Sequence, residues 1–276
     1  AVGFESNTKN RLVSLFGQAS LSYEGWANLE FSAANDWDSR LNIDNNSYFY
    51  PAVSASLLLT DAIPALGESK ILSYAKLRGS WSKSANVNLL TYALEPTFSQ
   101  SGGFPFGNLG GFGADNFVTN PLIQPEKVNS KEIGIELGFM KNRFNLDVTY
   151  FTQKNTDQIL DVQQSAAAGP TLYRTNTADF KNYGVEIDLN LTPLVKIGTG
   201  RLNFGFNATY NDNKIISLFP GINELSIGGT NLFTQIAASS PDAFNYAIVG
   251  KPAFVFKLSD YARDAQGRVI VDRITG

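Results

Sequence analysis

The sequence has no cysteine and no histidine among its 276 residues. The absence of cysteine excludes disulfides and thiolate metal ligands, and the absence of histidine excludes imidazole ligands, Ser-His and Cys-His nucleophile pairs and the usual near-neutral general base. The sequence therefore lacks the residues on which many enzyme mechanisms depend. Carboxylate-pair chemistry of the glycosidase kind remains, because it needs only two suitably separated Asp or Glu side chains.

Long apolar runs are also missing. No run of about 18 apolar residues occurs, so no transmembrane helix is expected, and residues 1–12 lack the basic start and apolar core of a signal peptide. The 22 basic and 25 acidic residues give a net charge of −3, which offers no electrostatic reason for a nucleic-acid partner. Any contact with a membrane would have to use strands.

The sequence does contain a clear alternation with a period of two residues. In the segment 132–139 the odd positions are apolar and the even positions are acidic or glycine. The segments 143–155 and 182–192 alternate in the same way. Successive side chains of a strand point to opposite faces, so this pattern predicts strands with one apolar and one polar face, and a β-hairpin across residues 130–151.

Alternation predicts eight strands in the chain, although it is weaker in the first and noisier in the third and fourth. Each is about 10 to 13 residues long, more than the 5 to 6 typical of globular strands and close to the 9 to 11 needed by a tilted strand that crosses a bilayer. The predicted ranges are 11–23, 26–36, 48–60, 71–83, 131–140, 143–155, 182–192 and 201–212. The fold class is therefore all-β.

The predicted connections alternate in length. Those at 24–25, 61–70, 140–142 and 193–200 are short, whereas those near 37–47, 84–130, 156–181 and from 213 onward are mostly long. Outer-membrane barrels have short periplasmic turns and long extracellular loops. Several tyrosine and tryptophan residues also fall near strand ends, where aromatic girdles sit. A transmembrane barrel is favoured over a half-buried sheet in a soluble sandwich, which would explain the alternation equally well but not the sorting of loops.

The two faces then receive different assignments. We expect the apolar side to contact lipid through Ile133, Ile135, Leu137, Phe139, Val185, Ile187 and Leu189. We expect the polar side to line the lumen through Glu132, Glu136, Asp147, Glu186 and Asp188. These acids could be read as a hydrolytic pair, but their regular placement favours a wet lumen. These acids have no obvious basic partners on the same strands. A small barrel is filled by its own side chains, so this face is better suited to an arc of a wide barrel.

Two further segments are candidate sites. The glycine-rich segment 99–117 carries Phe104, Phe106, Phe112 and Phe117, which could form a platform for a partner or a sugar; the alternative is that these rings pack the loop onto its neighbours. Asp260, Asp264 and Asp272 raise the possibility of calcium, but their spacing is not that of an EF-hand, and "DAQG" predicts a hairpin turn instead. No metal or other cofactor is expected.

Several segments carry a family resemblance. "YFYPAVSASLLLTD" (48–61), "LSYAKLRGSWSKSAN" (72–86), "NPLIQPEKVNSKEIGIELGFMKNRFNLDVTYFTQKNTDQIL" (120–160), "NYGVEIDLNLTPL" (182–194) and "NFGFNATYNDNKIISL" (203–218) resemble, in order, the SusC/RagA family of TonB-dependent outer-membrane transporters. The segment 248–272 is similar to the family's next extracellular loop. Two departures, "SWSKSAN" and "AFVFKL", leave the substrate class open.

The resemblance implies a barrel of 22 strands with an N-terminal plug. Residues 1–276 would supply only its middle arc, so the chain is expected to be a piece of a longer polypeptide. The implied function is import of glycan or peptide fragments through the outer membrane, energised by TonB and assisted by a surface lipoprotein of the SusD type, without enzymatic activity. A receptor or adhesin barrel without transport is the alternative, and a soluble β-sandwich acting on carbohydrate is a weaker one.

Overall fold

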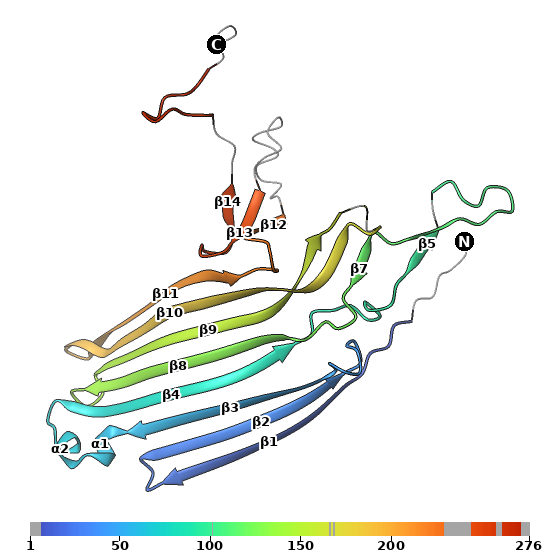
Figure 1. Ribbon diagram of the computed structural model, residues 1–276. Helices are drawn as coiled ribbons and strands as arrows, with labels where there is room; N and C mark the ends of the chain where they lie inside the picture. Colours follow the sequence, from blue (N-terminus) through green and yellow to red (C-terminus); the bar gives the residue numbers. More distant parts are fainter. Residues whose placement is uncertain are drawn as a thin grey trace.

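The computed structural model describes residues 7–100, 102–165, 167, 169–228, 244–257 and 261–271, and one sheet dominates it (Figure 1). Its eight long strands are hydrogen-bonded in the order β1-β2-β3-β4-β8-β9-β10-β11, and every neighbouring pair is antiparallel. They are β1 (Leu12–Tyr23), β2 (Ala27–Asp38), β3 (Ser47–Leu58), β4 (Leu72–Asn86), β8 (Glu126–Phe139), β9 (Phe144–Gln163), β10 (Leu172–Ile197) and β11 (Gly200–Ser217).

Shorter elements lie between and after the long strands. Two one-turn helices, α1 (Leu59–Ala62) and α2 (Pro64–Gly67), connect β3 to β4. Three short strands follow β4: β5 (Phe98–Gln100), β6 (Phe112–Ala114) and β7 (Phe117–Thr119), of which β7 pairs in parallel with the start of β10. A separate three-stranded sheet follows β11 and consists of β12 (Glu224–Gly228), β13 (Phe244–Ile248) and β14 (Val255–Lys257).

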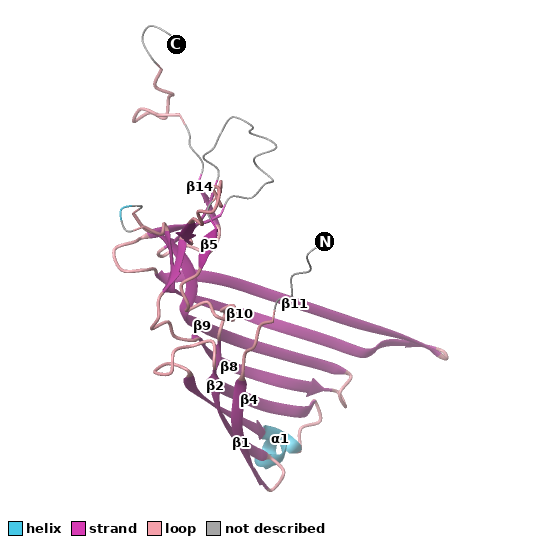
Figure 2. Ribbon diagram, turned by 90° about the vertical axis from the view of Figure 1, so that its right-hand side faces the viewer, coloured by secondary structure: helices cyan, strands magenta, loops and turns pink. Residues whose placement is uncertain are grey.

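The prediction of an all-β arc is confirmed. Each of the eight predicted strands corresponds to one long strand of the sheet, and Figure 2 shows these strands side by side in a single curved layer. A hydrogen-bonded ladder continues from β1 to β11 without closing on itself, so β1 and β11 are the free edges of the sheet.

The short connections lie together at one end of the sheet, on the left in Figure 1. One of them is the turn between β1 and β2, where Glu24 (φ 47°) and Gly25 (φ 77°) both have positive φ. Two consecutive residues of this kind match the type I′ turn, whose twist suits antiparallel strands. We call this side the short-turn end, and the opposite side, where the chain passes through residues 39–46, 87–125 and 164–171, the loop end.

The prediction of a long connection at 156–181 was wrong. β9 continues to Gln163 and β10 begins at Leu172, so only residues 164–171 connect them. The apolar alternation fades here, but the ladder continues, and Arg174 binds Asp161 across it with Nε 2.7 Å from Oδ1. Backbone pairing and cross-strand contacts therefore extend the strands beyond the segment that periodicity can detect.

The buried core is small and lies at the loop end. One apolar cluster consists of Leu41, Val87, Leu89, Ile123 and Ile159. A second, made of Ala178, Ile215, Leu218 and Ala247, joins β10 and β11 to the three-stranded sheet. Among the described residues, no second layer covers either face in the middle of the main sheet (Figure 2).

Candidate functional site

The polar face of the main sheet is hollowed between β1 and β8. Residues paired in register lie on the same face, and such pairing places one polar residue of each strand in a row. The row runs Ser20, Glu30, Ser54, Ser80 and Glu132. All five line an open cavity of ≈ 320 Å³. This face is therefore concave and lined by hydroxyl and charged groups.

A cluster of charged residues extends this row on β4, β8 and β9. Arg78 donates from Nη2 to Asp147 Oδ1 at 2.8 Å and to Thr149 Oγ1 at 2.6 Å, and its Nε lies 3.3 Å from Glu136 Oε1. Lys76 donates to the same Glu136 oxygen at 3.1 Å. Two cations from β4 thus neutralise one carboxylate from each of the next two strands.

The path of Arg78 depends on the glycine that faces it. Gly134 of β8 is the register partner of Arg78. A Cβ atom at Gly134 would lie 3.0 Å from Arg78 Cζ and 3.1 Å from Thr149 Oγ1, closer than ordinary side-chain contacts. A glycine at this position lets the guanidinium lie over β8 and reach β9, whereas a larger residue would displace it. Gly134, one of the even-position glycines of the alternating pattern, therefore provides the space in which the Arg78 side chain lies.

All five acids predicted to share a face do so. Glu186 is paired with Thr149 and Asp188 with Asp147 across the β9–β10 ladder, which places both on the face of the Arg78 cluster. Asp188 accepts a hydrogen bond from the Asn190 side chain. The cluster brings Glu136 and Asp147 together around Arg78, while Glu132 lies at the cavity between β1 and β8.

The seven apolar residues predicted to share a face also do so. Their register partners on neighbouring strands are apolar too. Ile135 is paired with Leu77 and Val148, and Val148 is paired with Ile187. A parallel row joins Leu137, Leu146, Leu189 and Phe206. The same rows extend to β2 and β3 through Leu57, which pairs with both Leu77 and Ala27. One face is therefore continuously apolar across the sheet.

On β4 and on β8 to β11, this apolar surface has a defined edge toward the loop end. The next row on the same face runs Trp81, Lys131, Thr152, Tyr183 and Asp212. The Trp81 indole N–H donates to Asn129 Oδ1 at 3.1 Å, and the Tyr183 hydroxyl donates to Asp212 Oδ2 at 2.9 Å. Amphipathic aromatic and charged side chains replace aliphatic ones within a single step along the strands. Such a change is typical of a membrane–water boundary.

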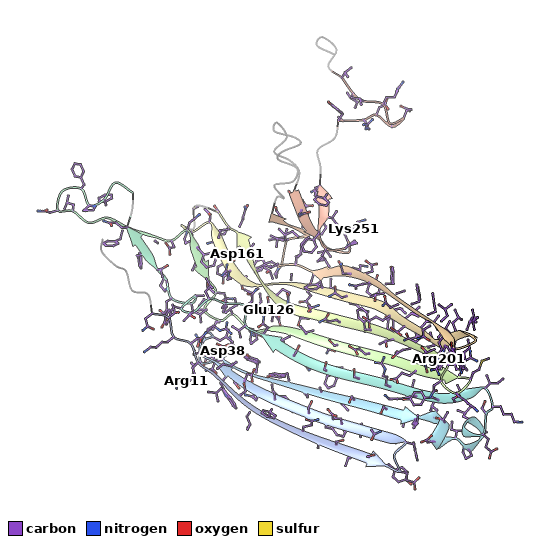
Figure 3. All side chains as sticks on the ribbon, turned by 180° about the vertical axis from the view of Figure 1, so that it is seen from behind. Arg11, Asp38, Glu126, Asp161, Arg201 and Lys251 are labelled. Carbon is purple, nitrogen blue, oxygen red and sulfur yellow. The ribbon has the colours of Figure 1, made fainter. Side chains whose placement is uncertain are left out.

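The loop end is held by a buried ion pair. Asp38, labelled in Figure 3, is only 1% exposed. It accepts from Arg40 Nη2 at 2.6 Å and from Arg40 Nε at 3.0 Å. Arg40 also donates to the carbonyl of Leu89 at 3.1 Å, which ties the β2–β3 connection to the segment after β4. Leu89 itself belongs to the apolar cluster beneath these loops.

The four phenylalanines of the segment 99–117 do not form one patch. Phe117 lies in β7 with the Arg174 guanidinium carbon 4.5 Å from its ring centre, and the Phe104 ring lies against Gly111, where a Cβ would be 2.6 Å from Cδ1. Phe106 and Phe112 are 75% and 72% exposed. Phe117 therefore packs the segment onto β10, Phe104 packs within the segment, and Phe106 and Phe112 are free to contact something else.

The acidic segment considered for calcium forms a hairpin turn around Asp264. Its carboxylate accepts from the backbone N–H groups of Gln266 and Arg268 and from Arg268 Nε at 2.7 Å. Donation by the Arg268 backbone N–H lowers the pKa of Asp264 below its usual value. Within the described ranges no group of three or more acids could hold a metal ion, and Asp260 and Asp272 lie outside those ranges.

Sequence reasoning missed the cations of the polar face and the Asp38–Arg40 pair. Lys76 and Arg78 lie on the strand whose alternation was noisy, and their partners come from β8 and β9, so no single strand shows the balance of charge. The even spacing of Lys76, Arg78 and Ser80 was the available signal. The proximity of Asp38 and Arg40 in the sequence gave a weaker hint, because their burial depends on the distant segment around Leu89.

Comparison with known proteins identifies the family. The profile described as "TonB dependent receptor-like, beta-barrel" matches residues 2–268. Among curated relatives, the TonB-dependent receptor SusC of Bacteroides thetaiotaomicron is 26% identical over 223 residues, which are 78% of this chain and 22% of SusC. A TonB-dependent receptor of Formosa agariphila is 25% identical over 216 residues, 75% of this chain and 21% of the relative. The chain thus spans about a fifth of the length of these relatives.

Solved structures show the same fold. The RagAB peptide transporter superposes with a TM-score of 0.77 at 21% identity, covering 93% of this chain and 26% of that chain. The RagAB peptide importer in its open-open state gives a TM-score of 0.70 at 19% identity, covering 95% of this chain and 29% of that chain. Among the helices that the structure describes, none is long and apolar enough to cross a membrane.

Proposed function

The chain belongs to the TonB-dependent receptor β-barrel family, whose members are outer-membrane proteins, and from this membership we propose that residues 1–276 form one arc of a larger transmembrane barrel. The plug and the remaining strands are contributed by other parts of a longer protein. The short-turn end faces the periplasm and the loop end faces the exterior, in keeping with the sorting of loops in such barrels.

One observation supports this arrangement more than any other: the sheet is continuously apolar on one face and polar and concave on the other. Ile133, Ile135, Leu137, Phe139, Val185, Ile187 and Leu189 are on the apolar face, which in this proposal contacts lipid. Glu132, Glu136, Asp147, Glu186 and Asp188 are on the polar face, which lines the lumen. Lipid chains can cover the apolar face, so no second sheet is needed there, and water in the lumen can solvate the polar face.

The function proposed for the whole protein is import of glycan or peptide fragments, driven through TonB and fed by a surface lipoprotein of the SusD type. The family and the relatedness to SusC support a transporter, and the RagAB transporter of similar fold handles peptides. The protein is proposed not to be an enzyme, because Glu136 and Asp147 are engaged by Lys76 and Arg78 in ion pairs.

The test is to extract the full-length protein from outer membranes in detergent and identify by mass spectrometry the lipoprotein and the small molecules that accompany it. The released ligand is then labelled and offered to cells with and without functional TonB. Accumulation inside cells that depends on TonB supports import. Surface binding that is equal in both strains would reject import in favour of a receptor or adhesin, and a protein that stays soluble without detergent would reject the barrel itself.

A further inference from the structure

The apolar face carries a groove at the short-turn end that neither the ionic cluster nor the loops account for. It has a volume of ≈ 450 Å³ and lies where β4, β8, β9 and β10 begin or end. Its apolar lining comes from Ile71, Phe139, Phe144, Leu191, Pro193 and Leu194. Phe139 and Phe144 close the β8–β9 hairpin as an edge-to-face pair with ring centres 5.4 Å apart. In strand order, the two rings of β8 and β9 therefore lie between Ile71, next to β4, and the apolar residues of β10.

The hairpin turn beside this groove has an unusual backbone conformation. Met140, Lys141 and Asn142 all have positive φ, a backbone conformation that residues other than glycine seldom adopt. Met140, the one methionine among these 276 residues, lines the groove and is 60% exposed. Backbone strain kept in a turn and an exposed, adaptable apolar side chain are both features of binding surfaces.

The rim of the groove is positively charged. Arg143 lines it and donates from Nη2 to the carbonyl of Pro193 at 2.9 Å, and no carboxylate among the described residues pairs with it. Lys141 is exposed two residues earlier. The segments 137–146 and 191–201 contain no acidic residue, while Glu136 and Asp147, which flank the first of them, point to the opposite face and bind cations of β4. An anion at this rim would meet no opposing carboxylate from these segments.

The rest of a barrel would leave the groove uncovered. It lies within the strand order β4-β8-β9-β10, whereas further strands can pair only at the free edges β1 and β11. A plug inside the lumen would meet the other face. The occupant must therefore come from the surroundings of the barrel, and it must be apolar along its length and anionic at its end.

We propose that this groove is a binding site for one anionic phospholipid, such as phosphatidylglycerol, at the short-turn end. An acyl chain lies along Phe139, Phe144 and Leu191, and the phosphate is bound by Arg143 with Lys141 beside it. Arginine suits this role because its guanidinium keeps free N–H donors while one holds Pro193. This inference rests on the proposed function only in that the apolar face contacts lipid.

The experiment is native mass spectrometry of the full-length protein in detergent, titrated with phosphatidylglycerol. Wild type should retain the lipid, and the double variant Lys141→Gln, Arg143→Gln should retain it at least roughly fivefold less, as expected for loss of cations that face an anionic headgroup. Leu194→Asn, which keeps both cations, should also reduce retention. Lys131→Gln is the control, because Lys131 lies on β8, the strand that leads into this turn, at the far edge of the same apolar surface.

Inorganic phosphate distinguishes a lipid site from a simple anion site. If the groove recognises the whole lipid, millimolar phosphate should leave retention unchanged; displacement by phosphate would overturn the proposal, as would equal retention by the double variant and the control. Should the double variant fail to assemble, Lys141→Gln alone repeats the test. Failure of the barrel assignment has a different signature: wild type would stay soluble without detergent and retain no lipid at all.

Discussion

Arg78 of β4 binds Asp147 of β9 across the whole width of the strand between them, with Nη2 2.8 Å from Oδ1. Asp147 also faces Asp188 on β10, so without this cation two carboxylates would oppose each other directly. The side chains of Arg78 and Asp147 are about a third exposed, and ion pairs of this exposure contribute roughly 0.2–1 kcal/mol each. The pairing therefore serves mainly to fix the position of charge on the polar face.

The role of Gly134 can be tested by a double-mutant cycle with Arg78. Gly134→Ala should destabilise the full-length protein by about 1 kcal/mol in the presence of Arg78, because the added Cβ displaces the guanidinium. In an Arg78→Ala background the same change should cost clearly less, because only the close contact with Thr149 Oγ1 remains. Thermal melting in detergent measures both. Equal effects in the two backgrounds would contradict this role, and Gly17→Ala is the control, since nothing lies within 4 Å of a Cβ at that position.

The two faces of the sheet should respond oppositely to an added arginine. Leu137→Arg should cost about 2–4 kcal/mol if the side chain lies near the bilayer midplane. Thr209→Arg is the matched change on the polar face, where the register partner is Glu186, and we expect it to be tolerated. The readout is the fraction of full-length protein in the outer membrane that resists unfolding by detergent at room temperature. Similar losses for both variants would argue against a lipid-facing apolar side.

The phenylalanines of the segment 99–117 should separate into two classes. Phe106→Ser with Phe112→Ser should weaken capture of the surface lipoprotein and leave assembly unchanged, because both rings are exposed. Phe117→Ser removes the ring beneath Arg174 and should instead increase proteolysis of the loop. Co-purification of the lipoprotein and limited proteolysis distinguish the classes. If capture is unchanged in the first variant, these rings do not contact the partner.

Loss of the Asp38–Arg40 pair should loosen the loop end. Arg40→Gln leaves the buried Asp38 carboxylate without its cation and frees the Leu89 carbonyl, at a cost on the order of 1–3 kcal/mol. Hydrogen exchange should rise in residues 87–94 and remain unchanged in the middle of the sheet. Arg268→Gln removes an exposed pair with Asp264 and provides the control. Unchanged exchange in 87–94 would show that the apolar cluster alone holds these loops.

The sequence by itself determined the strands and their two faces. A period of two residues is set by backbone geometry alone, so Ile135 and Glu136 had to lie on opposite faces of whatever sheet β8 joined. Turn chemistry such as Glu24-Gly25 then fixed the hairpins, and the quoted segments indicated the family before any neighbour was known.

The tertiary structure decided what each face contains. The partners of Glu136 and Asp147 depend on strand order and register, which bring β4 beside β8, and no property of the single strands specifies that order. The extension of β9 and β10 and the burial of Asp38 likewise depend on contacts between segments far apart in the chain. The local periodicity of the sequence predicts the face to which a side chain points, whereas only the assembled sheet determines which residues it contacts on that face.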